Sequence, residues 1–131
     1  MIVLDTHTWV WWVSGSPRLS GTARQAIDRS LGEHGIYLSS ISVWEVALLA
    51  KSGRLRLSIG VEDWIAKSEA LPFLNFVAVD NRIALRSTQL PEPLHSDPAD
   101  RIIIATTLSL RAKLITKDKK LANYPYVETL W

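Results

Sequence analysis

Acidic side chains recur just after short apolar runs of this chain, and together they could support metal-dependent chemistry. Asp5 directly follows the apolar residues 2–4, and Asp118 lies just past the run at 113–116. Converging carboxylates repel one another unless a cation compensates their charge, and Mg²⁺ and Mn²⁺ prefer such oxygen ligands. The other acids at comparable places are Glu45, Asp80, Asp97 and Asp100. The pattern therefore predicts a carboxylate site for a hard divalent cation.

Helix capping is the alternative explanation for most of these acids. Ser42 and Glu45 have the spacing of a capping box, and Asp97 before Pro98 is typical of a helix start. Asp5 is the hardest to explain in this way, because a carboxylate that ends an apolar strand needs a donor or a metal. Capping could also account for Asp80, Asp100 and Asp118. Taken one at a time, most of these acids are better explained by structure than by catalysis.

The other metal-binding and nucleophilic side chains give weaker signals. His7, His34 and His95 are widely spaced, and none has a second ligand three or four residues away. We interpret them as hydrogen-bonding or exposed histidines. The chain has no cysteine, which excludes a thiolate zinc site, a cysteine nucleophile and a disulfide scaffold.

Strand and helix patterns alternate along the chain, and they define where the acids would lie. Short β-branched runs predict strands at 2–4, 36–38, 76–79 and 113–116, with an edge strand at 126–127. Helical spacing and caps predict helices at 6–13, 20–31, 43–51, 61–71, 82–90 and 97–110. This alternation favours an α/β fold with a mostly parallel sheet covered on both faces. In such sheets ligands bind at the carboxyl ends of the strands, where these acids occur.

Length and composition predict one globular domain spanning residues 1–131. Hydrophobic residues make up 47% of the chain and charged residues 21%, which are ordinary values for a folded protein. The apolar stretches are too short to cross a membrane, and no secretory signal begins the sequence. We therefore expect a cytoplasmic protein with no membrane partner.

Basic and aromatic residues are unevenly distributed. The net charge is only +2, but residues 101–120 carry six basic side chains against one acid. This segment could bind a polyanion, although a solvated helix face is the more common reason for such a run. Three of the six tryptophans are Trp9, Trp11 and Trp12. Core packing is the favoured explanation, and a protein interface or base stacking is the alternative.

Four segments in a fixed order carry a family resemblance. They read IVLDTH at 2–7, SSISVWE at 39–45, DPADRIIIA at 97–105 and LITKD at 114–118. With these separations the chain resembles PIN-domain ribonucleases, and within them the VapC toxins of toxin–antitoxin modules. The resemblance spans nearly the whole chain and implies a PIN-like three-layer α/β/α fold.

The resemblance also implies a role for individual residues. Asp5, Glu45 and Asp100 match the three core acids of the family, and Asp118 matches the more variable fourth. Asp97 is a cap, a water-mediated ligand or an antitoxin contact, whereas Asp80 has no counterpart and is assigned to capping. The remaining residues are expected to orient the acids, in the case of Thr6 and Thr116, or to bind the RNA backbone, in the case of Arg101, Lys117, Lys119 and Lys120.

The implied activity is endoribonucleolytic hydrolysis of RNA with one or two carboxylate-held Mg²⁺ or Mn²⁺ ions. The implied partners are RNA and a small VapB-like antitoxin, in a homodimer or a larger toxin–antitoxin assembly. A metal site does not by itself name its substrate, so a phosphatase or DNA nuclease is an alternative. A non-catalytic nucleic-acid-binding module is the third interpretation, in which the acids are only caps.

Overall fold

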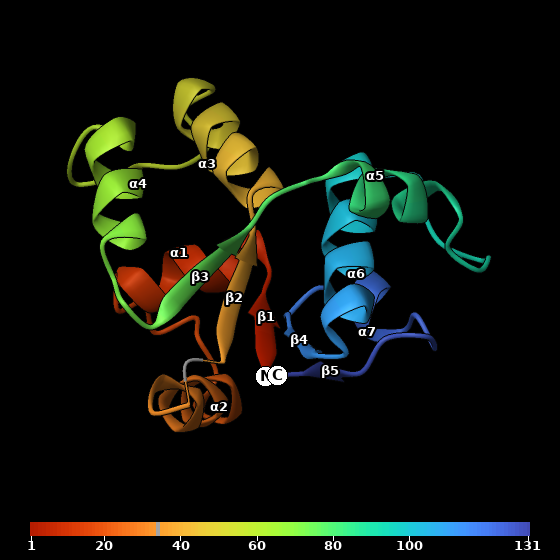
Figure 1. The fold of residues 1–131 in the computed structure, drawn as a ribbon. Coiled ribbons are helices and arrows are strands. Elements are labelled where there is room, and N and C mark those ends of the chain that lie inside the picture. The colour runs from red at the N-terminus through yellow and green to blue at the C-terminus, as the bar shows by residue number, and fades with distance from the viewer. Residues whose placement is uncertain (34) are drawn as a thin grey trace.

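A five-stranded parallel sheet forms the centre of the computed structural model, with the strand order β3-β2-β1-β4-β5 (Figure 1). The structure describes residues 1–33 and 35–131, so the interpretation of His34 lies outside the described residues. The strands are β1 (Ile2–Leu4), β2 (Ile36–Ser39), β3 (Leu74–Val77), β4 (Lys113–Ile115) and β5 (Thr129–Leu130). The helices are α1 (Thr6–Val13), α2 (Gly21–Leu31), α3 (Ile41–Lys51), α4 (Val61–Glu69), α5 (Asn81–Thr88), α6 (Pro98–Leu110) and α7 (Lys119–Ala122).

The order of the strands places a switch point beside β1. From β1 the chain builds β2 and β3 on one side, and then crosses over to add β4 and β5 on the other. In parallel sheets the connections that diverge at such a point leave a crevice at the carboxyl ends of the two central strands. Here those strands are β1 and β4, which pair from Ile2 with Lys113 to Leu4 with Ile115.

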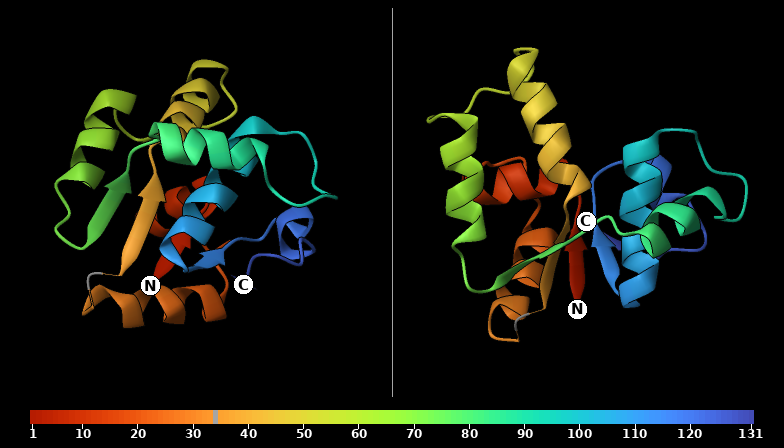
Figure 2. Two further views of the ribbon diagram at one scale, coloured as in Figure 1. Left: turned by 45° about the vertical axis from the view of Figure 1, so that its right-hand side comes forward. Right: turned by 45° about the horizontal axis from the view of Figure 1, so that its top comes forward.

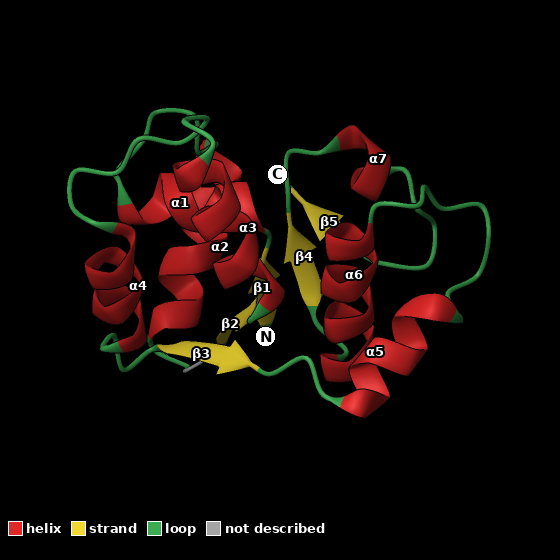
Figure 3. Cartoon of the chain, turned by 90° about the horizontal axis from the view of Figure 1, so that it is seen from above, coloured by secondary structure: helices red, strands yellow, loops and turns green. Residues whose placement is uncertain are grey.

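Alternating side chains of the sheet build two separate hydrophobic layers. Ile2 and Leu4 of β1 pack into the layer that contains Trp9, while Val3 packs into the layer that contains Ile104. Figure 3 shows α1, α2 and α4 on one side of the sheet and α5, α6 and α7 on the other. Figure 2 shows α5 and α6 side by side. The predicted three-layer α/β/α fold is confirmed.

Two predicted strands are misplaced along the sequence. The strand expected at 76–79 lies at Leu74–Val77, because its partner β2 ends at Ser39, which pairs with Val77. The edge strand expected at 126–127 was wrong: β5 is Thr129–Leu130, which pairs with Leu114 and Ile115. The apolar residue at 127 instead contributes to a hydrophobic layer. In both places the partner strand, and not the local apolar pattern, determines the bounds.

The tryptophans divide between core and surface. Trp9 is fully buried and its indole nitrogen donates to Ser68 Oγ at 3.2 Å, with Trp64 packed against it. Core packing is therefore the correct explanation for Trp9. Trp44 on α3 is 55% exposed. Among the described residues no helix is both long and apolar enough to span a membrane.

Candidate active site

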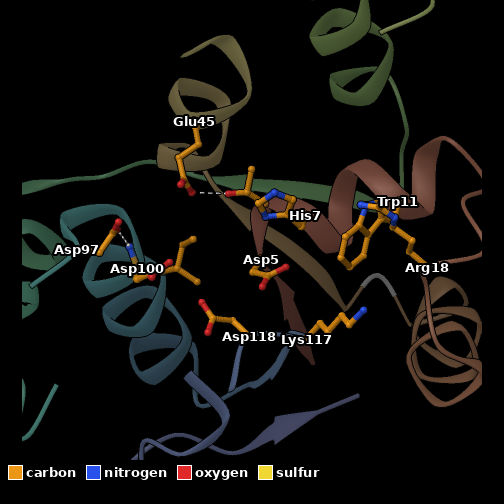
Figure 4. Close-up of a pocket in the computed structure, with 11 residues that line it drawn as sticks. Asp5, His7, Trp11, Arg18, Glu45, Asp97, Asp100, Lys117 and Asp118 are labelled. Atoms are coloured by element: carbon orange, nitrogen blue, oxygen red, sulfur yellow. Dashed lines mark hydrogen bonds between the residues drawn. The ribbon is translucent and has the colours of Figure 1, made fainter. Parts of the chain in front are cut away.

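A pocket of about 560 Å³ lies at the carboxyl ends of β1 and β4, at the switch point of the sheet. Five carboxylate side chains line it from four different parts of the chain (Figure 4). They are Asp5, Glu45, Asp97, Asp100 and Asp118. The structure thus brings together all five acids that the sequence singled out for metal binding, and it leaves Asp80 outside the pocket.

Asp5 is both the cap of α1 and part of the pocket wall. Its Oδ1 accepts a hydrogen bond from the backbone N–H of Thr8 at 2.9 Å, and its Oδ2 accepts one from the Thr116 hydroxyl. The residue is only 8% exposed. Burial raises the pKa of the Asp5 carboxyl, against the opposing effect of the Thr116 and Thr8 hydrogen bonds. This carboxylate is therefore held in one orientation by Thr116, which directly follows β4, and by its own helix.

Thr116 connects the ends of β1 and β4. Its hydroxyl donates to Asp5 and accepts a hydrogen bond from the backbone N–H of Asp118 at 3.0 Å. Asp118 in turn caps α7 by accepting from the Lys120 N–H at 2.8 Å. The predicted supporting role of Thr116 thus has a defined geometry, because this one hydroxyl links two of the acids.

Glu45 reaches the pocket from α3 and is oriented by α1. The Thr6 hydroxyl donates to Glu45 Oε1 at 2.5 Å and also lies 2.9 Å from Ser42 Oγ. The capping-box explanation of Ser42 and Glu45 was wrong, because α3 begins two residues earlier than predicted and its N-cap, Ser40, makes no side-chain cap. Both side chains instead face Thr6. Their hydrogen bonds to Thr6, which lies 36 and 39 residues away along the sequence, take the place of the expected local cap.

Asp97 and Asp100 share the first turn of α6 but have different roles there. Asp97 is the N-cap and accepts the backbone N–H of Asp100 at 2.9 Å. The Asp100 carboxylate points elsewhere: its Oδ2 lies 2.7 Å from His95 Nε2. The interpretation of His95 as a hydrogen-bonding histidine is confirmed, although the sequence did not indicate that its partner is one of the acids.

The acids of the pocket destabilise one another's charged forms. Burial is the main cause that raises the pKa of Glu45, and the charges of Asp100 and Asp97 raise it further. Burial likewise raises the pKa of Asp100, with contributions from Asp97 and Asp118 and an opposing hydrogen bond from His95. Such a set of partly desolvated anions attracts any cation that can reach it.

The donor set fits a hard cation by its chemistry. All five acids offer carboxylate oxygens, the ligand type that Mg²⁺ and Mn²⁺ prefer, and each is linked to the protein in a way that leaves lone pairs free. Within the part of the chain that the structure describes, however, no three acidic or histidine side chains are close enough to hold an ion jointly. The carboxylates line one side of the pocket without meeting at one point, so several would have to rotate inward to coordinate one ion.

Three of the basic residues expected to hold RNA are not part of the pocket lining: Arg101, Lys119 and Lys120. The Arg101 guanidinium is engaged in the preceding loop, where it donates to the carbonyls of His95 and Leu94 and to Glu92. Lys117 does line the pocket, as does Thr6.

Sequence reasoning missed the wall of the pocket opposite α6. Trp11 and Arg18 line that wall together with His7. Helical spacing indicates that Trp11 lies one turn from His7, but nothing local relates either residue to Arg18, which lies in the loop before α2. Contacts with residues distant in sequence position that loop, so only the structure shows that Arg18 lines the pocket.

Fold and site together define an α/β protein with an acidic pocket at the switch point of its sheet. The chain belongs to the PIN domain family, whose match spans residues 2–126. Ribonuclease VapC22 of Mycobacterium tuberculosis (strain ATCC 25618 / H37Rv) is 33% identical to it over 132 residues, which cover 99% of this chain and 98% of that protein. The predicted resemblance to PIN domains and to VapC proteins is confirmed.

Solved structures agree on the fold. The toxin–antitoxin complex from Klebsiella pneumoniae contains a chain that matches with a TM-score of 0.69 and 23% identity, covering 100% of this chain and 97% of that one. FitAcB from Neisseria gonorrhoeae matches with a TM-score of 0.71 and 21% identity over the same shares of the two chains. The arrangement of layers described above is therefore shared with these proteins.

Proposed function

We propose that this chain is a metal-dependent endoribonuclease that acts as the toxin of a toxin–antitoxin module. The observation that carries the proposal is the convergence of five carboxylates on one pocket of a PIN domain. The similarity to a protein named as a ribonuclease supports RNA as the substrate. Burial and mutual repulsion of the acids support a role beyond helix capping.

Asp5, Glu45, Asp100 and Asp118 would hold Mg²⁺ or Mn²⁺, with Asp97 at the edge of the set. When bound, such an ion lowers the pKa of water and compensates charge on the phosphate and on the leaving oxygen. The chain's own contribution is orientation. Hydrogen bonds from hydroxyl groups fix two of these acids, and an imidazole fixes a third.

Basic side chains would bind the RNA backbone around this centre. Lys117 lies in the pocket wall, and Lys119 and Lys120 follow it in the first turn of α7, so the three side chains form a short basic segment next to Asp118. Phosphate contacts of this kind supply affinity without reading sequence. We propose that Arg101 anchors the loop at 92–95 and does not bind the substrate, since its guanidinium already donates hydrogen bonds to that loop.

The partner proposed for this chain is a small VapB-like antitoxin. Similar folds occur in chains of a toxin–antitoxin complex and of VapBC assemblies bound to DNA, which supports an analogous complex here. We further propose a homodimer. On α3, Trp44 is 55% and Leu48 45% exposed, which is the kind of apolar area that interfaces cover. A cytoplasmic location accords with an RNA substrate.

The substitution Asp5→Asn tests the activity. We expect the variant to lose RNA cleavage and growth inhibition, because it removes one charged ligand from the centre while asparagine still caps α1. The measurements are gel-based cleavage of single-stranded RNA with Mg²⁺ or Mn²⁺, and the thermal shift that Mn²⁺ produces.

Asp80→Asn is the matched control. Asp80 caps α5 by accepting the N–H of Ile83 at 2.9 Å, the same contact that Asp5 makes with Thr8, but it lies outside the pocket. Cleavage by Asp5→Asn at the wild-type rate would contradict the proposal. Equal turnover of single-stranded DNA or of a phosphate monoester would favour the DNA nuclease or phosphatase instead, and the absence of any Mn²⁺ effect would favour a binding module.

A further inference from the structure

The pocket has two chemically opposite walls. The acids occupy one, and Trp11, Arg18 and Lys117 occupy the other; we call these three residues the cationic rim. They come from α1, from the loop before α2 and from the segment after β4. Figure 4 shows them together on the side of Asp5 that faces away from Asp97 and Asp100.

Trp11 is the centre of the cationic rim. The Cζ of Arg18 lies over its ring at 6.0 Å from the ring centroid, and the Nζ of Lys117 lies over it at 5.8 Å. The indole is itself supported by Trp131 and His7, whose ring centroids are 5.8 Å and 5.7 Å away. Because the π-face of an indole attracts cations, this ring holds both side chains near the pocket.

Both cations of the rim are available to a ligand. Among the described residues, no carboxylate lies within ion-pair distance of Arg18 or Lys117, although five acids line the same pocket. Both side chains are exposed. An aromatic ring positions a cation without neutralising it, which is the property required of a site for an anion.

We propose that Arg18 and Lys117 bind the phosphate backbone of the RNA strand on one side of the scissile bond, with Trp11 as the positioning residue that holds them. This inference rests on the proposed function. A strand that places one phosphate among the acids is repelled there, so adjacent cations offset part of that repulsion. Since the rim lies on one side of the acids only, it also fixes the side on which that length of strand lies.

Binding of a fluorescein-labelled single-stranded RNA decamer, measured by anisotropy in EDTA, tests the two cations. Arg18→Gln and Lys117→Gln should each weaken binding several-fold and make the slope of log affinity against log salt shallower by about 0.7. Arg24→Gln and Lys51→Gln are the matched controls, because both side chains are exposed and neither lines the pocket. Their slopes should equal that of the wild type.

Substitutions of Trp11 test the positioning role. Trp11→Phe keeps an aromatic face and should retain most of the RNA affinity and the full salt slope. Trp11→Leu should reproduce the loss seen for Arg18→Gln, including the shallower slope, which reduced folding alone would not cause. Melting temperatures of both variants identify any general loss of structure. A Trp11→Leu variant that loses affinity with an unchanged slope would instead indicate a base stacked on the ring, and would overturn the inference.

The inference and the proposed function fail in different ways. If wild-type protein cleaves RNA but Arg18→Gln and Lys117→Gln bind it like their controls, the cationic rim does not contact the backbone. If wild-type protein shows no salt-dependent RNA binding, the inference is overturned as well. If salt-dependent binding follows the rim but no divalent ion supports cleavage, the nuclease proposal alone is wrong.

Discussion

At the scale of single residues, capping and site chemistry are not exclusive roles for a carboxylate. Asp5, Asp97 and Asp118 each cap a helix through Oδ1 and each also lines the pocket. A carboxylate has two oxygens with about four lone-pair positions, so a cap uses only part of its capacity. The capping and metal-binding interpretations of these acids are therefore compatible. The hydrogen bond of the cap fixes one carboxylate oxygen and thereby orients the other.

Asp100 offers a test of the electrostatics, because burial raises its pKa above the ordinary value of 3.8. A carboxyl whose pKa is higher in the folded than in the unfolded state stabilises the fold when protonated. That contribution is present below pH 3.8 and is lost as the pH rises through the raised folded-state pKa. At neutral pH the ionised group therefore costs stability. We expect Asp100→Asn to raise Tm by a few degrees at pH 7 in EDTA.

The measurement is thermal unfolding from pH 3.5 to pH 8, with and without Mg²⁺. The increase in Tm caused by Asp100→Asn should become smaller as the pH falls. Mg²⁺ should raise the Tm of the wild type more than that of the variant, because the variant has lost a metal ligand. Asp28→Asn, on the exposed face of α2, serves as the control. A variant less stable than wild type at pH 7 would show that the contact with His95 outweighs the cost of burial.

At the scale of elements, the sequence predicts which helices and strands exist better than where they end. The helix start at Asp97-Pro98 is correct because cap and proline are both local signals. The bounds of β3 and β5 depend on pairing with β2 and β4, and no local pattern contains that information. Both β3 and β5 end at the residue that pairs with the last residue of the partner strand.

The site, too, was predicted where its signals are local in sequence and missed where they depend on contacts between distant residues. Acids at strand ends could be predicted to converge, because parallel strands bring their carboxyl ends to one edge of the sheet. The partners that orient them could not: Thr6 contacts Glu45 across 39 residues, and Thr116 contacts Asp5 across 111. Arg18 was missed for the same reason, since a loop residue enters the pocket only through tertiary packing, which here brings it next to Trp11.

The start of α6 allows the cap and ligand roles of Asp97 to be separated. Asp97→Ala removes the hydrogen bond to the Asp100 N–H and should lower the free energy of unfolding by about 1 kcal/mol. Asp97→Asn keeps a cap of similar strength, so its stability should stay close to that of the wild type. Urea unfolding measures both values, and RNA cleavage is followed in parallel. Loss of cleavage by Asp97→Asn with unchanged stability would identify Asp97 as a ligand of the metal or the substrate.

At the scale of the whole molecule, a small net charge conceals a strong separation of charge. The chain carries only +2 overall, yet five acids gather in one pocket, with Arg18 and Lys117 on its other wall and further basic residues on α7. An acidic pocket of this kind can attract a basic side chain of a protein as readily as a metal ion. The proposed antitoxin and the proposed metal could therefore depend on the same carboxylates.

Competition between the two is the expected consequence. An arginine of the antitoxin could pair with Asp5 or Asp100 through two hydrogen bonds and so remove ligands that the metal needs. The affinity for the antitoxin should then fall as Mn²⁺ rises at constant ionic strength, which titration calorimetry can measure. In Asp5→Asn the dependence on Mn²⁺ should be much weaker, whereas in Asp80→Asn it should match the wild type. An affinity that stays constant across the Mn²⁺ series would mean that the antitoxin inhibits without occupying the acidic pocket.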